Sequence, residues 1–87
     1  MLYEVHVEIT LKPTVMDAQG TTIERALHKM GHANVSKVRI GKFVTMEIDA
    51  DTPNSAREVA ETMCKELLAN PIIEQYHVQV VEKEPVS

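Results

Sequence analysis

The hydrophobic residues follow two different spacings, and the order of those spacings constrains the fold of this chain most strongly. Between Leu2 and Leu11, apolar and polar side chains alternate strictly, and several of the apolar ones are β-branched. This period of two predicts a half-buried strand, and Pro13 ends it because proline has no amide to donate. The same alternation predicts three further strands, at Val35–Ile40, at Phe43–Ala50 and from about Glu74 to Val81.

A helical spacing separates the first strand from the second. The apolar positions follow i, i+3, i+4 and i+7 and form one stripe, made of Ile23, Ala26, Leu27 and Met30. Two N-caps are open: Asp17, or Thr21 in a capping box with Glu24 three residues later. Gly31 suits the left-handed position that ends a helix.

A second helix follows the third strand. Thr52 and Pro53 are a cap and a first-turn proline, and Asn70 with Pro71 marks the end. Its apolar stripe is long and contains Ala56, Val59, Ala60, Met63, Cys64, Leu67 and Leu68.

The predicted order is therefore β-α-β-β-α-β, with Gly41 and Lys42 as the tight turn of a central hairpin. We expect a single α+β domain over residues 1–82, followed by a flexible tail at 83–87. The matching architecture is the ferredoxin-like one, a four-stranded antiparallel sheet with both helices on one face. The other face would be polar, with charges of both signs. It is either solvated or a wet interface with a second copy.

Composition excludes several classes of function. The net charge is −4 and aromatic residues are 3% of the chain, which argues against binding nucleic acid. The single cysteine, Cys64, falls on the apolar stripe of the second helix and is expected to be a core residue. Neither a signal peptide nor a membrane-spanning run is evident, so we expect a cytoplasmic protein.

The chemistry of known ferredoxin-like proteins is also missing. The loop from Pro13 to Gly20 has no cysteine for a metal carrier and no arginine for an acylphosphatase-like anion cradle. His6 and His77 fall on the polar strand faces, where surface histidines are expected rather than metal ligands. Since no nucleophile has an adjacent base, the sequence points away from an enzyme that acts alone.

Three stretches, in this order and at this chain length, resemble the PurS family, the small subunit of phosphoribosylformylglycinamidine synthase. They are Leu11–Gly20, Val38–Phe43 and Cys64–Tyr76. One departure is Ala18, where the family usually has proline, and it affects only where the helix starts. The resemblance implies a non-catalytic, homo-oligomeric subunit (dimer or tetramer) of a ligase complex in purine biosynthesis. Its partners would be a large amidating subunit and a glutaminase subunit.

The resemblance also implies that this chain binds no cofactor itself, because ATP, Mg and glutamine are used by the partner subunits. The polar turns then supply the candidate subunit contacts, which are Lys12, Asp17, Gln19, Arg39 and Lys42. Backbone geometry explains the candidate turn and cap residues, which are Gly20, Gly31, Gly41, Asn70 and Pro71. The alternative function is an ACT-like domain that senses a small molecule, since it shares the predicted topology.

Overall fold

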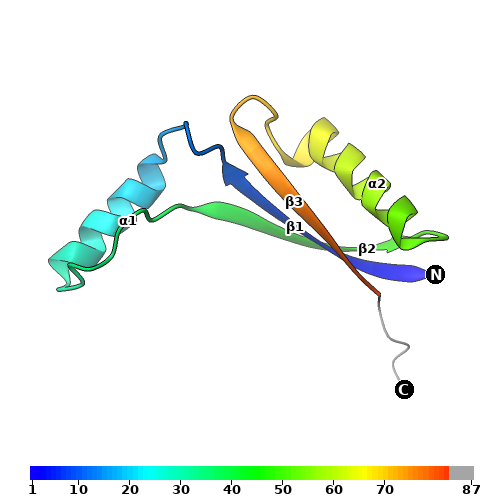
Figure 1. Cartoon of the computed structure of the whole chain (residues 1–87), viewed down its shortest axis with the longest axis horizontal. Coiled ribbons are helices and arrows are strands. Elements are labelled where there is room, and N and C mark those ends of the chain that lie inside the picture. Colours follow the sequence, from blue (N-terminus) through cyan, green and yellow to red (C-terminus); the bar gives the residue numbers. More distant parts are fainter. Residues whose placement is uncertain (83–87) are drawn as a thin grey trace, which may run out of the picture.

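The structure is a computed structural model of the 87-residue chain, and it describes residues 1–82. Three strands and two helices follow one another, with a π-helical turn after the second helix (Figure 1). Their bounds are β1 Leu2–Leu11, α1 Ala18–Lys29, β2 Gly41–Asp49, α2 Pro53–Met63, the π-turn η1 Cys64–Leu68 and β3 Glu74–Glu82. The tail predicted at 83–87 lies outside the described residues.

The sheet has three antiparallel strands in the order β2-β1-β3, so the prediction of a four-stranded sheet was wrong. The stretch Val35–Ile40 is not a strand, and Gly41 starts β2 instead of turning a hairpin. The physical reason lies in the backbone amides of this stretch. Carboxylate oxygens of Glu24 and Asp17 accept from the amides of Val38 and Ile40, at 3.1 and 2.6 Å. Side chains thus take the place of a neighbouring strand.

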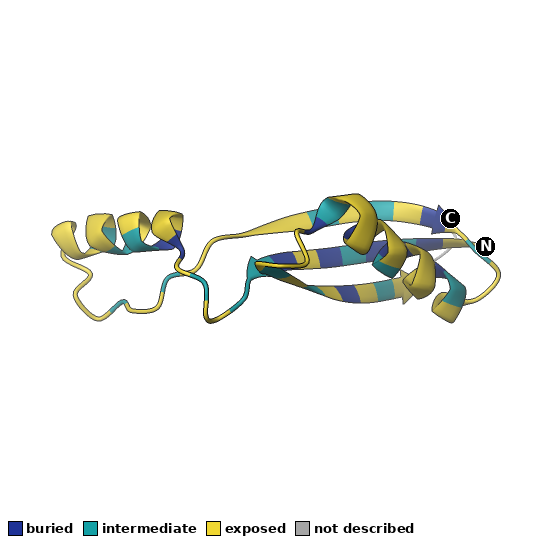
Figure 2. Ribbon diagram, turned by 90° about the horizontal axis from the view of Figure 1, so that it is seen from above, coloured by how far each residue is buried: buried dark blue, intermediate teal, exposed yellow. Residues whose placement is uncertain are grey.

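The core lies between one face of the sheet and α2. The central strand β1 contributes its whole apolar side, Tyr3, Val5, Val7 and Ile9, none of which is more than 3% exposed. Ala56, Ala60 and Cys64 face them from α2 and η1, and small side chains there let the helix approach the sheet closely. Figure 2 shows buried and more exposed residues alternating along the strands, as expected when only one face of the sheet is covered.

The first helix does not lie on the sheet, contrary to the prediction that both helices cover one face. Figures 1 and 2 show α1 standing beyond the end of the sheet, connected to it by the chain on either side. The molecule is consequently long and thin, with extents of 50 × 35 × 15 Å. We call residues 18–40, which comprise α1 and the chain leading back to β2, the arm.

The predicted helix ends are confirmed in most details. Asp17 is the N-cap of α1 and accepts from the amide of Gly20, whereas Glu24 is turned to Val38 and forms no capping box. Gly31 takes a left-handed φ of +100°, a value that favours glycine. Thr52 caps α2, with Pro53 as its first residue.

Candidate subunit interface

The candidate contact residues lie at one end of the sheet, at the junction where β1 ends, the arm departs and β2 begins (Figure 1). Arg39 ties these segments together, because its Nη2 donates to the backbone oxygens of Lys12 at 3.1 Å and Val15 at 3.0 Å. The amide of Lys12 in turn donates to the oxygen of Ile73, just before β3. Since its guanidinium already holds two carbonyls of its own chain, Arg39 shapes the surface as well as contributing charge to it.

Asp17 lies inside this junction and is only 5% exposed. Its carboxylate accepts from the amide of Gly20 at 2.9 Å and from that of Ile40 at 2.6 Å. The hydrogen bonds from Gly20 and then Ile40, with the nearby Arg39 guanidinium, hold the pKa of Asp17 below its usual value, although desolvation opposes them. Asp17 therefore joins the start of α1 to the start of β2 and fixes where the arm leaves the sheet.

Gly20 is required by the same close approach. A Cβ at this position would lie 2.2 Å from the backbone oxygen of Val38, far inside contact distance. At Gly41, a Cβ would lie 2.7 Å from the oxygen of Ile9. Both glycines thus serve backbone packing, and Gly41 does so as the first residue of β2 instead of in the tight turn predicted for it.

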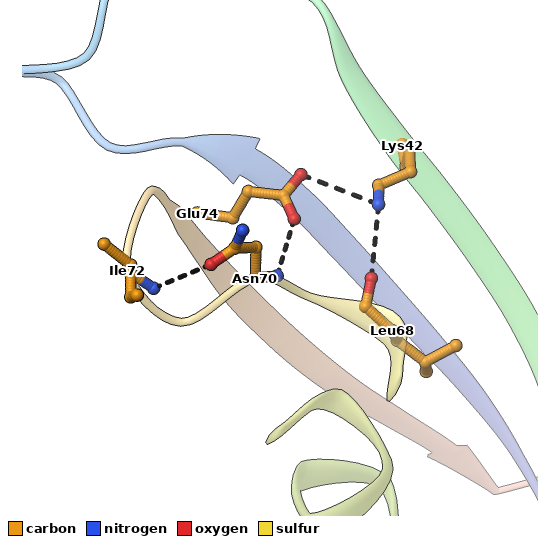
Figure 3. Close-up of polar contacts among 5 residues, drawn as sticks. All are labelled: Lys42, Leu68, Asn70, Ile72 and Glu74. Carbon is orange, nitrogen blue, oxygen red and sulfur yellow. Dashed lines mark hydrogen bonds and ion pairs between the residues drawn. The ribbon is translucent and has the colours of Figure 1, made fainter. Parts of the chain in front are cut away.

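Lys42 belongs to a polar cluster that joins β2 to the start of β3 (Figure 3). Its Nζ donates to the oxygen of Leu68 at 3.2 Å and lies 3.6 Å from a carboxylate oxygen of Glu74. The other oxygen of Glu74 accepts from the amide of Asn70, whose side chain caps the amide of Ile72. Asn70 thereby builds the turn after η1, next to Pro71.

A hollow of about 640 Å³ opens between the end of β1 and the arm, lined by ten residues that include Asp17, Glu24 and Arg39. These three side chains all bond to backbone groups of their own chain. Gln19 lies outside this hollow, on an exposed and shallower depression with Ile23 and Ile40. In the hollow, the Thr21 hydroxyl donates to the backbone oxygen of Asp17 and the Thr10 hydroxyl accepts from Gln75.

The face of the sheet opposite α2 carries one feature that the sequence analysis missed. Phe43 is 61% exposed there and packs edge-on against His6, with ring centroids 5.4 Å apart. Phe43 lies two residues before Thr45 in β2, and residues at this spacing point to the same face of a sheet. This spacing could have predicted the position of Phe43. His6 Nε2 is also within hydrogen-bond distance of a carboxylate oxygen of Glu4, at 2.6 Å. His77 lies opposite Glu8 in the register of β1 and β3.

A second missed feature is the exposure of Leu67, which is 83% accessible although the helical stripe predicted it to be buried. The π-turn η1 explains the difference, because its wider turn rotates Leu67 away from the core face, while Leu68 still packs against the core. Cys64, at the start of that turn, is fully buried as predicted, and burial raises the pKa of its thiol, with a smaller contribution from Glu61.

Nothing in the described part of the chain suggests a metal centre or a membrane span. Residues 1–82 contain no group of three or more His, Cys, Asp or Glu side chains placed to hold a metal ion. Nor does any helix among them have the length and apolar character needed to cross a bilayer.

Comparison with known proteins identifies the family. Residues 4–82 match the model of the PurS family, described as phosphoribosylformylglycinamidine (FGAM) synthase. The PurS subunit of Bacillus subtilis (strain 168) is 41% identical over 81 residues, which are 93% of this chain and 95% of that protein. These matches are to PurS proteins and do not support the alternative of an ACT-like sensor.

Solved structures agree with the sequence matches. The crystal structure of Methanocaldococcus jannaschii PurS superposes with a TM-score of 0.86 at 39% identity, covering 94% of this chain and 99% of that one. A chain of the structure of PurLQS from Thermotoga maritima gives a TM-score of 0.86 at 33% identity, covering 93% and 99%. With its length, fold and sequence all matched, the chain belongs to the PurS family of FGAM synthase subunits.

Proposed function

We propose that this chain is the assembly subunit that joins the amidating and glutaminase subunits of FGAM synthase. The synthase is a ligase of purine biosynthesis that converts formylglycinamide ribonucleotide to the amidine, with ATP and with ammonia released from glutamine. The observation that carries the proposal is the match to a PurS chain within a structure of PurLQS, together with family membership over residues 4–82. We propose that the synthase containing this chain is located in the cytoplasm.

The geometry supports a binding role rather than a chemical one. Three charged side chains at the junction, Asp17, Arg39 and Lys42, are engaged with backbone atoms or with another charged group. They hold a surface in shape and are not set up to transfer protons or groups. We therefore assign ATP, magnesium and glutamine to the partner subunits.

We further propose that the partner subunits contact this chain at the junction where β1 ends, the arm departs and β2 begins. The candidates Lys12, Gln19, Arg39 and Lys42 lie together there, on segments far apart in the sequence. Asp17 acts indirectly, since it is buried and positions the segments around it. Charged and amide side chains on a shaped surface suit a polar, specific contact between subunits.

Gel filtration of the three purified proteins tests the assembly role. The large subunit and the glutaminase should co-elute in the presence of this chain and elute separately without it. Co-elution of those two proteins to the same extent in its absence would contradict the proposal.

Side-chain substitutions at the junction and away from it test the proposed surface. Lys42→Gln combined with Gln19→Ala should weaken co-elution, whereas Lys65→Gln, which removes one exposed positive charge on η1, should not. An equal effect of both changes would show that net charge, and not the junction, governs the contact.

A further inference from the structure

The face of the sheet that α2 leaves open carries negative charge. In the part of the chain that the structure describes, its outward side chains include Glu4, Glu8 and Glu47 but no lysine or arginine. Asp49, at the end of β2, is paired with the N-terminal amine at 3.0 Å. The sequence predicted charges of both signs on this face. That prediction was wrong, because the basic residues of the stretch 35–40 lie outside the sheet.

An exposed aromatic ring lies next to these carboxylates. Phe43, the only phenylalanine of the chain, is 61% exposed. In the register of β1 and β2 it lies directly opposite Glu8, so the two side chains are neighbours on this face. His6 packs edge-on against the ring and is itself within 2.6 Å of a carboxylate oxygen of Glu4. The ring is thus held by its own chain on one side while most of it stays accessible.

The carboxylate of Glu8 is free to contact another molecule. Within residues 1–82 no hydrogen bond or ion pair engages it, and the residue opposite on β3 is His77. Farther along the same face, Glu4 and Glu47 line a hollow of about 340 Å³ with Thr45 between them in the sequence of the lining. The face therefore offers carboxylate oxygens at two places, and one of these is beside an exposed ring.

Arginine is the side chain that suits this arrangement best. Its planar guanidinium stacks on an aromatic ring within about 6 Å of the centroid, and its N–H groups donate to carboxylates at the same time. A guanidinium over Phe43 would reach the carboxylate of Glu8 on the neighbouring strand. The same face of a second copy would not fit, because two surfaces of equal negative charge repel one another.

We propose that one partner subunit of the synthase contacts this open face through a positively charged surface, with an arginine stacked on Phe43 and paired with Glu8. Gly41, two residues before Phe43, starts β2 at the junction, so the open face adjoins the contact proposed there. Aromatic and arginine side chains are frequent anchors of protein interfaces, which accounts for a phenylalanine exposed among charges. The inference rests on the proposed assembly role and adds to it the chemistry of the partner.

Titration calorimetry with the purified subunits gives the first test. Each form of this chain is titrated into each partner subunit alone and into the mixture of the two. Glu8→Gln should weaken binding to one partner at least about tenfold. Phe43→Leu keeps an apolar side chain but loses the ring, and it should weaken the same contact about 3- to 30-fold. Glu58→Gln is the matched control, because it removes an exposed carboxylate from α2, and it should leave the affinity unchanged. Circular dichroism checks that each variant is folded.

Chemical modification of arginine gives the second test. Phenylglyoxal, which reacts with guanidinium groups, is applied to the partner subunit with and without this chain at a saturating concentration, and mass spectrometry locates the modified residues. The wild-type chain should protect at least one arginine of the partner. The double variant Glu8→Gln with Phe43→Leu should leave that arginine reactive.

The outcomes separate this inference from the assembly role on which it rests. Unchanged affinity for both partners in the two variants, an equal loss with Glu58→Gln, or protection of the same arginines by the double variant would each overturn the inference and leave the assembly role intact. A wild-type chain that binds neither subunit, alone or in the mixture, would overturn both.

Discussion

Replacing Val7 by alanine tests how much of the fold depends on the single layer between the sheet and α2. Val7 is fully buried at the centre of β1, paired with Val44 on one side and Val78 on the other. Val59→Ala is the matched control, because the same two methyl groups are removed from a side chain of α2 that is 40% exposed.

The magnitude follows from the atoms removed. Two methyl groups leaving a buried site cost about 1.6 kcal/mol in transfer free energy. The cavity left behind raises the loss to about 2–3 kcal/mol. A domain of 87 residues has a total stability of about 4–13 kcal/mol, so this one change removes a large part of it. The corresponding fall in melting temperature is roughly 10–20 °C. At position 59, the better helix propensity of alanine offsets the smaller loss of burial, and the change should stay within about 0.5 kcal/mol.

Urea unfolding followed by circular dichroism measures both variants. All three proteins must be compared at one protomer concentration, since unfolding coupled to dissociation depends on concentration. A loss below about 1 kcal/mol for Val7→Ala, or equal losses for the two variants, would refute the assignment of the core.

Three further predictions concern individual side chains. The hydrogen bond from the amide of Gly20, and then that from Ile40, lower the pKa of Asp17 in the folded protein. The carboxylate therefore stabilises the fold at pH values above its unfolded pKa, and this contribution is lost as the pH falls through the folded pKa. Asp17→Asn should remove this component from urea midpoints measured between pH 7 and 3, and an unchanged pH profile would contradict the role given to the carboxylate. Burial raises the pKa of the Cys64 thiol, so a thiol-specific reagent at pH 8 should react only as fast as the protein opens; immediate reaction would show an accessible thiol. Arg39→Lys cannot hold both carbonyls of the turn, and the amide of Val15, which bonds within that turn, should exchange its hydrogen roughly tenfold faster; an unchanged rate would show that Arg39 does not hold the turn.

Local sequence patterns predicted the secondary structure well where one segment determines its own conformation. The alternation of β1 and the cap at Thr52 depend on neighbours in the sequence, and the structure confirms them. Of the two N-caps left open for α1, the structure shows Asp17. The burial of Cys64 was predictable in the same way, since it is the first residue of the π-turn and still follows the helical spacing of α2.

The errors arose where the conformation depends on more than the local hydrophobic spacing. The stretch Val35–Ile40 alternates like a strand. However, two of its backbone amides donate to the carboxylates of Asp17 and Glu24, which lie at least 14 residues away in the sequence. The stripe of α1 has the pattern of a core helix, yet no local signal indicates whether its own sheet or another surface covers it. Leu67 was misplaced because the change from α to π geometry is not encoded in hydrophobic spacing.

The central claim is that this chain assembles the synthase and contributes no chemistry, and the most direct measurement is turnover by the reconstituted enzyme with two nitrogen sources. With glutamine, formation of the amidine product should fall to near background when this chain is omitted. With ammonia supplied directly, the large subunit should retain most of its activity without it. Undiminished glutamine-dependent turnover in the absence of the chain, or an equal loss with both nitrogen sources, would contradict the account.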